Sequence, residues 1–136
     1  MKDDVLLRRI IDYCAEIEDD RIRFGDTLDD FLEDSSYQRS CCMNLMQIGE
    51  AVRKLSTELT EQHDEIDWMA VVGFRNIVAH RYETLNRSRI WEIITEDVPK
   101  LMSICENVLT SARFRKKLEG LPVRNVGFVV SCHPCS

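Results

Sequence analysis

The fold of this chain is decided by residues 41–59, which read CCMNLMQIGEAVRKLSTEL. Apolar residues recur there in unbroken steps of three and four: Cys41, Leu45, Ile48, Val52, Leu55 and Leu59. Because such spacing places one apolar stripe along a helix, we predict a helix from Ser36 to about Leu59 that packs against other helices. Gly49 interrupts the stripe at a cost of about 1 kcal/mol relative to alanine, which indicates a close neighbouring backbone.

Similar stripes precede and follow this segment. Residues 3–20 have apolar residues at helical spacing, and Asp67 is a good N-cap for a helix that begins at Trp68. We expect that helix to fray near residues 80–82. The stretch 21–36 predicts a bend with a short helical piece, and 60–65 predicts a surface loop.

The last apolar series runs from Ile90 to Ala112, and Asn86 can cap its start. Pro99 either kinks one helix there or begins a second segment from an Asp97 cap. Only 5 glycines and 3 prolines interrupt the chain, which favours long helices with short joints. We therefore predict an all-α fold, an antiparallel bundle of four to five helices over residues 1–117, followed by a C-terminal tail at 118–136.

The composition favours one soluble, cytoplasmic domain. At 136 residues and 44% apolar content, the chain can bury one core. We expect neither a membrane span nor a secretory signal, since no apolar run reaches the necessary length. Four cysteines lie in helical apolar patterns and should be reduced core thiols: Cys14, Cys41, Cys42 and Cys105. Cys132 and Cys135 have the spacing of half a zinc site without a second pair, so we expect no metal and no cofactor.

The net charge of −6 is divided unevenly along the chain. Residues 1–68 hold 18 acidic and 8 basic side chains, whereas residues 69–136 hold 6 acidic and 10 basic ones. The acidity is therefore confined to the first half. A local basic surface for nucleic acid is compatible with this division, and so is an ordinary solvated helix face.

Side chains with catalytic chemistry are concentrated in the stretch Gly73-Phe74-Arg75-Asn76-Ile77-Val78-Ala79-His80-Arg81-Tyr82. A permanently charged arginine, a histidine that titrates near neutral pH and a tyrosine hydroxyl suit phosphate-ester chemistry without a metal. At 100° per residue, Asn76 and His80 share one side of a helix, whereas Arg75 and Tyr82 lie nearer another. We therefore expect a helix end near His80, or a cleft shared by two copies of the helix.

The same residues also fit structural roles. His80 would then be a satisfied helix-end histidine, Arg75 would pair with an acidic neighbour, and the Tyr82 ring would pack at the rim of the core. Taken one by one, these residues do not decide between the structural and the catalytic interpretation.

In its wider context, the stretch resembles the HEPN superfamily, and within it the HepT-like toxins, whose signature is Arg, four to six residues, His, any residue and Tyr. Here the signature runs from Arg75 to Tyr82 with a gap of four and an asparagine after the arginine. Further segments are similar to HepT-type sequences in order and spacing: Ile48-Gly49-Glu50-Ala51 followed by Leu55-Ser56, then Ile66-Asp67-Trp68, and Trp91 with Asp97-Val98-Pro99. The resemblance extends from about residue 5 to about residue 112.

This resemblance implies a bundle of HEPN type and a metal-independent endoribonuclease, the toxin of a type VII toxin–antitoxin pair. Arg75 and His80 would be catalytic, with Arg75 stabilising charge on the scissile phosphate and His80 handling a proton. Asn76 would orient one of them.

The resemblance also implies partners. The protein would act as a homodimer on RNA, either tRNA or mRNA. Its antitoxin would be a nucleotidyltransferase of the MNT type that attaches AMP to Tyr82 and so blocks activity. Arg81, Arg87 and Arg89 are candidates for contacts with the RNA backbone. The alternative function is a non-catalytic helical module that binds a nucleotidyltransferase partner or a nucleotide.

Overall fold

The computed structural model describes residues 2–80 and 86–119 and confirms an all-α bundle. In chain order its helices are α1 (Lys2–Phe24), α2 (Leu28–Leu32), α3 (Ser35–Arg53), α4 (Thr57–Gln62), α5 (Trp68–His80), α6 (Arg87–Glu92), the π-helix η1 (Ile93–Asp97) and α7 (Val98–Glu119). The division into a bundle and a tail after residue 117 stays a prediction, since residues 120–136, with Cys132 and Cys135, lie outside the described residues.

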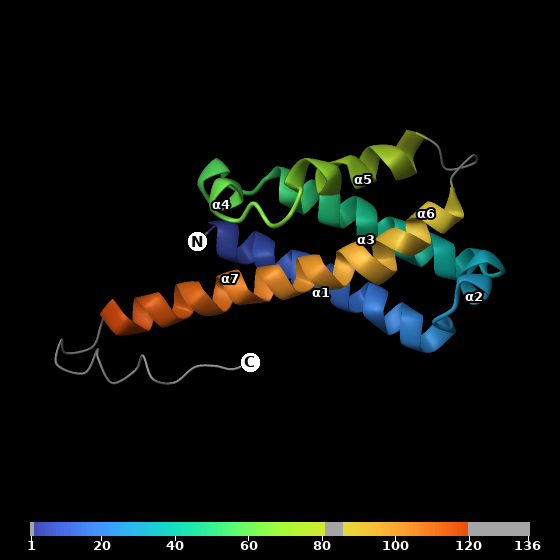
Figure 1. Ribbon diagram of the computed structural model, residues 1–136, viewed down its shortest axis with the longest axis horizontal. Helices are drawn as coiled ribbons and strands as arrows, with labels where there is room; N and C mark the ends of the chain where they lie inside the picture. The colour runs from blue at the N-terminus through green and yellow to red at the C-terminus, as the bar shows by residue number, and fades with distance from the viewer. Residues whose placement is uncertain (1, 81–85, 120–136) are drawn as a thin grey trace.

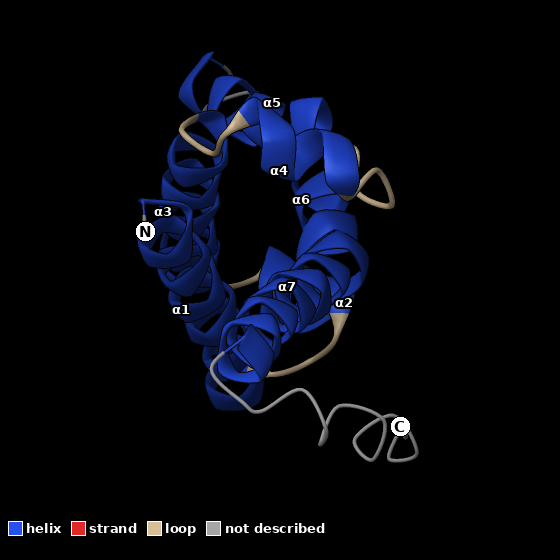
Figure 2. Ribbon diagram, turned by 90° about the vertical axis from the view of Figure 1, so that its left-hand side faces the viewer, coloured by secondary structure: helices blue, strands red, loops and turns tan. Residues whose placement is uncertain are grey.

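Four long helices, α1, α3, α5 and α7, run in alternating directions (Figure 1). The backbone of α3 packs against both α1 and α5, and α7 packs along α1. Viewed along the bundle, α1 and α3 form one side while α6 and α7 form the other (Figure 2). Helix α3, which contains most of the strongest apolar series in the sequence, therefore lies between two of its neighbours.

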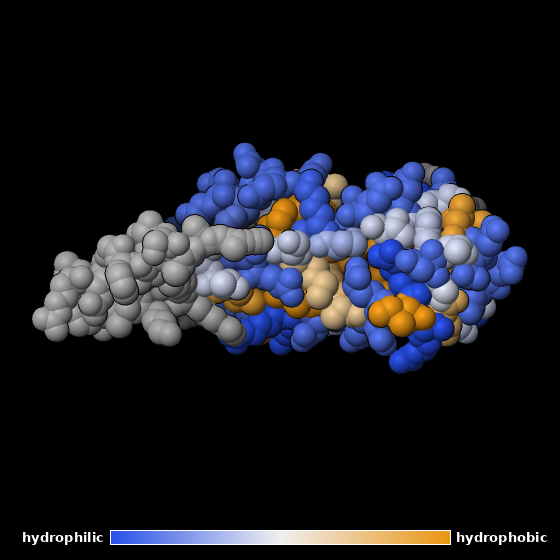
Figure 3. Space-filling model, turned by 60° about the horizontal axis from the view of Figure 1, so that its bottom comes forward, coloured by the Kyte–Doolittle hydropathy of each residue, from blue (hydrophilic) through white to orange (hydrophobic). Residues whose placement is uncertain are grey.

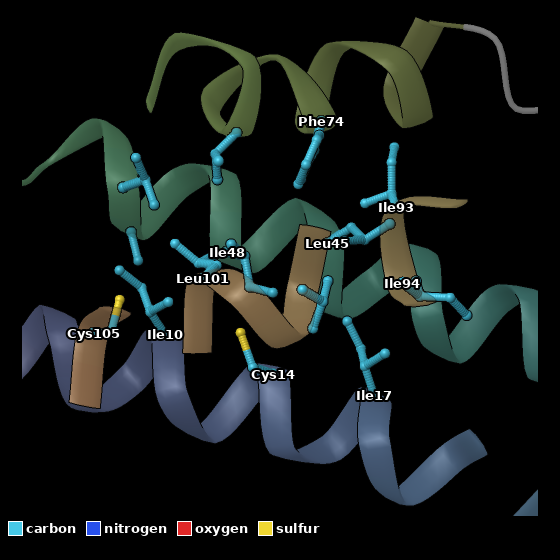
Figure 4. Close-up of a cluster of buried hydrophobic side chains, with 14 of the residues drawn as sticks. Ile10, Cys14, Ile17, Leu45, Ile48, Phe74, Ile93, Ile94, Leu101 and Cys105 are labelled. Carbon is cyan, nitrogen blue, oxygen red and sulfur yellow. The ribbon is translucent and has the colours of Figure 1, made fainter. Parts of the chain in front are cut away.

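The core lies where these helices face one another (Figure 4). Each long helix contributes residues that are at most 4% exposed: Ile10, Cys14 and Ile17 of α1, Leu45 and Ile48 of α3, Phe74 of α5, and Leu101 and Cys105 of α7. Ile93 and Ile94 of η1 are fully buried beside them. At about 25 cal/mol per Å² of buried apolar surface, this core is the main favourable term in folding.

All four predicted core cysteines are buried free thiols, as expected. Burial raises the pKa of Cys42 to about 11 and that of Cys105 to about 12, and it also raises the pKa of Cys14 and Cys41. Since the thiolate is the reactive form, these cysteines act as small apolar residues.

Polar side chains set the helix boundaries. The Asp34 Oδ1 atom accepts hydrogen bonds from the backbone N–H groups of Ser36 and Tyr37 at the start of α3. Asp67 accepts from Ala70 and Asn86 accepts from Arg89, so both predicted caps are confirmed. Each of these bonds satisfies a backbone donor that has no partner within its own helix.

The predicted helix from Ser36 to Leu59 was wrong at its C-terminal end. Helix α3 ends at Arg53, and the Ser56 hydroxyl caps the separate helix α4 by accepting from the N–H of Leu59. Asp3 of α1 fixes this break, because its carboxylate accepts from the Ser56 N–H at 3.0 Å and from the Ser56 hydroxyl at 2.6 Å. The apolar series survives the break, since Leu55 and Leu59 remain buried.

Around Pro99 the prediction of a second segment capped by Asp97 was wrong, because the helical residues continue without a break from α6 through η1 into α7. Asp97 lies inside η1 rather than capping a new helix, and α7 continues directly from Val98. In a regular helix the N–H of residue 99 donates to the carbonyl of Thr95, and proline has no N–H to donate. The π-helix η1 lies directly before this missing hydrogen bond donor. The Thr95 hydroxyl donates to the Trp91 carbonyl at 2.8 Å within the same turn.

The exterior is mainly polar. Figure 3 shows one face on which hydrophilic residues predominate and apolar residues occur in small groups. Within residues 2–80 and 86–119, no helix is both long and apolar enough to cross a membrane.

Gly49 lies where the backbone of α5 comes close to α3. A Cβ atom at this position would be 3.2 Å from the Val71 carbonyl oxygen, 3.3 Å from that of Val72 and 3.4 Å from the Arg75 Cβ. Two of these neighbours are backbone atoms, which cannot rotate away as a side chain does. The expected close backbone at Gly49 is confirmed.

Gly49→Val should therefore destabilise the protein by about 1–3 kcal/mol, because the added methyl groups would force α3 and α5 apart. Urea unfolding followed by circular dichroism measures this loss. Ala15→Val, on the exposed side of α1, is the control for placing a valine inside a helix and should cost less than about 1 kcal/mol. Equal losses in the two variants would contradict the close-approach explanation.

Candidate functional site

Helix α5 positions the motif residues that the structure describes. Val71, Phe74 and Val78 are at most 5% exposed and anchor the helix to the core. The opposite side is open, because Met69 is 78% exposed and a Cβ on Gly73 would meet nothing within 4 Å. The motif helix thus has one buried side and one side that faces outward.

Arg75 lies at the edge of the contact between α5 and α3. Its Nε atom forms an ion pair with the Glu50 Oε2 atom at 3.0 Å, and its side chain is 52% exposed. Glu50 also accepts a hydrogen bond at 3.0 Å from the Nη2 atom of Arg53, one turn further along α3. One carboxylate is therefore shared by two guanidinium groups, and the acidic partner that the structural interpretation expected for Arg75 is present.

The neighbouring cations shift the pKa of the Glu50 carboxyl. The hydrogen bond from Arg53, followed by the positive charges of Arg53, Arg75 and Lys54, lowers the pKa of the Glu50 carboxyl below its ordinary value of 4.5. Glu50 is therefore ionised at neutral pH. It fixes one side of the Arg75 guanidinium, whose half-exposed remainder can meet an anion from solvent.

His80 is the last described residue of α5, and only its backbone is placed. Five residues separate it from Arg75, so the two positions differ by about 140° around the helix. His80 shares its side of the helix with exposed Asn76 and with Gly73, which is the side that faces outward. Positions 75 and 80 thus lie on different sides of α5, while Arg81 and Tyr82 lie outside the described residues.

Arg87 and Arg89 are placed on α6, and each has a partner within the chain. The Arg87 Nε atom donates to the Gln38 Oε1 atom at 2.8 Å, and the Arg89 Nη1 atom donates to Glu92 at 3.1 Å. Gln38 is 9% exposed, and its amide nitrogen donates to the Phe31 carbonyl at 2.8 Å. Arg87 is therefore built into the corner between α2 and α3, and an RNA contact by either arginine stays a prediction.

Comparison with known proteins assigns this architecture. The family described as Ribonuclease HepT-like matches residues 10–108. The chain belongs to the HepT-like ribonuclease family. The matched range contains α3, α5, the ion pair between Glu50 and Arg75, and the whole motif from Arg75 to Tyr82.

Individual relatives agree with this assignment. A protein of Caldanaerobacter subterraneus named "Putative RNase" is 32% identical over 103 residues, covering 76% of this chain and 90% of that protein. Another "Putative RNase", from Methanocaldococcus jannaschii, is 32% identical and covers 68% of this chain and 87% of its own length. A "Probable ribonuclease HepT" of Thermococcus cleftensis is 30% identical, with 54% and 66% covered. No solved structure matches the chain.

Within the HepT-like fold, Glu50 is the site residue that inspection of the sequence did not select. It lies in Ile48-Gly49-Glu50-Ala51, a segment noted only for its resemblance to the family. The available signal was the pairing of a glycine with a following carboxylate in the middle of an apolar helix. Only the packing of α3 on α5 shows that this carboxylate meets Arg75.

Among the described residues, no group of three or more histidine, cysteine, aspartate or glutamate side chains is arranged to hold a metal ion. The described chemical groups near Arg75 are cations, one carboxylate and the exposed Asn76 amide. Such groups can bind and polarise a phosphate diester.

Glu50→Gln should make the free energy of unfolding fall less steeply as the pH is lowered below 4.5. Because the folded pKa of Glu50 lies below 4.5, the unfolded chain takes up this proton first as the pH falls. The stabilisation from Glu50 is fully present well above pH 4.5 and is lost as the pH drops through the lowered folded value. Urea midpoints measured from about pH 6 to about pH 3 test this linkage.

Glu16→Gln, which removes the same charge from an exposed position of α1, is the matched control. If the Glu50→Gln profile runs parallel to that of the wild type on the acid side, Glu50 is not coupled to its arginine neighbours as described.

Proposed function

We propose that this HepT-like protein is a metal-independent endoribonuclease that acts as a toxin. The observation that supports the proposal is a half-exposed Arg75 held on the motif helix by Glu50, within a ribonuclease family whose signature the chain carries in full. A fixed guanidinium with a solvent-facing side suits the binding of a phosphate diester and the stabilisation of its extra negative charge in the transition state.

His80 supplies the proton transfer in this proposal. The ribose 2′-oxygen attacks the adjacent phosphorus, the bond from phosphorus to the 5′-oxygen breaks, and a 2′,3′-cyclic phosphate remains. The 2′-hydroxyl loses a proton to a base and the leaving 5′-oxygen gains one from an acid. A histidine can perform either transfer near neutral pH, and Asn76 lies on the same side of α5 to orient it.

The active unit in this proposal is a homodimer. Positions 75 and 80 lie about 140° apart around α5 of one chain, so a second copy is the simplest way to bring both kinds of group to one phosphate. The outward side of α5 suits such a contact, because Met69 and Ile77 are exposed apolar residues four positions on either side of Gly73. A two-fold axis there would bring together the two copies of the side of α5 that contains Gly73, Asn76 and position 80.

The same proposal includes an antitoxin that attaches AMP to Tyr82. The tyrosine oxygen would attack the α-phosphorus of ATP and release pyrophosphate. The attached phosphate would be a negative charge near Arg75 and His80 in the motif, where it would compete with RNA phosphates and repel the incoming strand. Arg81, the adjoining residue, is a candidate for holding either the RNA backbone or the attached nucleotide.

Purified protein should cleave tRNA or mRNA in the presence of EDTA. Arg75→Ala should lower the rate about 10²–10³-fold through loss of charge stabilisation. His80→Ala should lower it about 10²–10⁴-fold through loss of proton transfer. Gel analysis of end-labelled RNA measures these rates, and detection of the 2′,3′-cyclic phosphate end checks the chemistry.

Two controls complete the experiment. Sedimentation should give twice the chain mass of 15.9 kDa, and mixed dimers of Arg75→Ala with His80→Ala should regain part of the activity if one site draws on both copies. Equal cleavage by the wild type and both variants would show a contaminating nuclease. Cleavage absent under all conditions, together with stable binding of a nucleotidyltransferase or nucleotide, would establish the non-catalytic module instead.

Co-expression with a nucleotidyltransferase encoded beside this protein should raise its intact mass by whole AMP units and abolish cleavage. Tyr82→Phe should prevent the mass increase, since it removes the hydroxyl oxygen to which the first AMP is attached. Tyr13→Phe, which alters a half-buried tyrosine of α1, is the matched control and should still be modified. An unchanged increase in Tyr82→Phe would assign the modification to another residue.

A further inference from the structure

A group of cations extends from Arg75 across the end of α3 to the start of α1. Besides Arg75, it contains Arg53 at the end of α3, Lys54 directly after that helix and Lys2 of α1, and all four side chains are exposed. These residues come from three segments that are distant in sequence. Figure 1 shows that the start of α1 and the C-terminal end of α3 lie at the same end of the bundle.

Two local observations connect these four residues. Arg53 and Arg75 both contact the Glu50 carboxylate at 3.0 Å, and Lys54 follows Arg53 directly in the chain. Lys54 and Lys2 line a shallow hollow of about 240 Å³ together with Asp3 and Ser56. Lys54 therefore belongs to both groups and joins the surroundings of Arg75 to the hollow.

The acidic residues within this surface are already engaged. Glu50 binds Arg53 and Arg75, and Asp3 accepts two hydrogen bonds from Ser56. Four cations outnumber the two carboxylates that lie among them, Glu50 and Asp3, on a chain whose first 68 residues are strongly acidic. Glu58 and Glu61 on α4, just beyond Ser56, limit the surface on that side.

We propose that Arg53, Lys54 and Lys2 form a phosphate-binding surface that guides the RNA strand away from Arg75, a surface we call the α3–α1 track. This inference rests on the proposed function, since it concerns the path of the same RNA. It assigns backbone contacts to residues at the end of α3 and the start of α1, in addition to the candidates Arg87 and Arg89 on α6. Such contacts contribute affinity without base specificity.

The α3–α1 track predicts a defined salt dependence. Each phosphate contact on a single strand contributes about 0.7 to the slope of log affinity against log salt concentration. Arg53→Ala combined with Lys54→Ala should therefore reduce that slope by about 1.4 and weaken binding about tenfold at low salt. Lys2→Ala combined with Lys54→Ala should act similarly while leaving both arginine partners of Glu50 in place.

The probe is a fluorescein-labelled single-stranded RNA whose riboses are 2′-O-methylated, because it binds like RNA but has no 2′-hydroxyl for the proposed cleavage. Fluorescence anisotropy at several salt concentrations gives both affinity and slope. Arg23→Ala combined with Lys100→Ala removes two exposed cations elsewhere and should change affinity less than about twofold. Circular dichroism verifies that every variant is folded.

The outcomes separate this inference from the proposed function. If both track variants bind as the wild type does, with the same slope, the α3–α1 track is overturned even when the protein cleaves RNA. If the track variants lose affinity and slope while no cleavage is found, the track stands and the nuclease proposal fails. Equal losses in the track variants and in the control pair would show that only net charge matters, and this too would overturn the inference.

Discussion

The contact between α3 and α5 is the constraint on which the candidate site depends. Gly49 has no side chain, so the α5 backbone can come close to α3. A Cβ atom at this position would be only 3.2 Å and 3.3 Å from the carbonyl oxygens of Val71 and Val72. The same approach places the Arg75 Cβ atom next to Gly49 of α3. Glu50, the next residue, then lies where it can pair with the Arg75 guanidinium. A bulkier residue at position 49 would move the arginine as well as the helix.

Glu50 has two effects that oppose each other. It offsets part of the positive charge of Arg75, which reduces the long-range attraction for a phosphate. It also restrains a long side chain that would otherwise lose rotamer freedom on binding, and a preorganised guanidinium binds an anion at a lower entropic cost. Arg53, bound to the other oxygen of the same carboxylate, restores positive charge to the surface.

A second fixed point lies after the motif. Gln38 of α3 donates to the carbonyls of Phe31 and Leu32 and accepts from Arg87. These bonds attach the start of α6 to the corner between α2 and α3. Helix α6 therefore begins at a position fixed by Gln38.

Local signals predicted some features of the fold and missed others. Asp67 and Asn86 were identified as caps because capping depends on a side chain and backbone groups within three residues. The end of α3 was missed because its apolar series continues through the break, and the break is fixed by Asp3, 53 residues before Ser56. The π-turn before Pro99 was missed as well, because proline signals an interruption without specifying which form it takes.

The sequence by itself determined the helical class, the core stripe of α3, the order of the motif residues and their angular separation on α5, because these follow from periodicity and helix geometry. The signature and its context also led to the HepT-like family. Only the tertiary structure decided that Gly49 receives the α5 backbone, that Glu50 pairs with Arg75, and that Lys2 and Lys54 line one hollow. These relations join residues from different helices, and a pairing of that kind depends on how the helices pack rather than on any spacing along the chain.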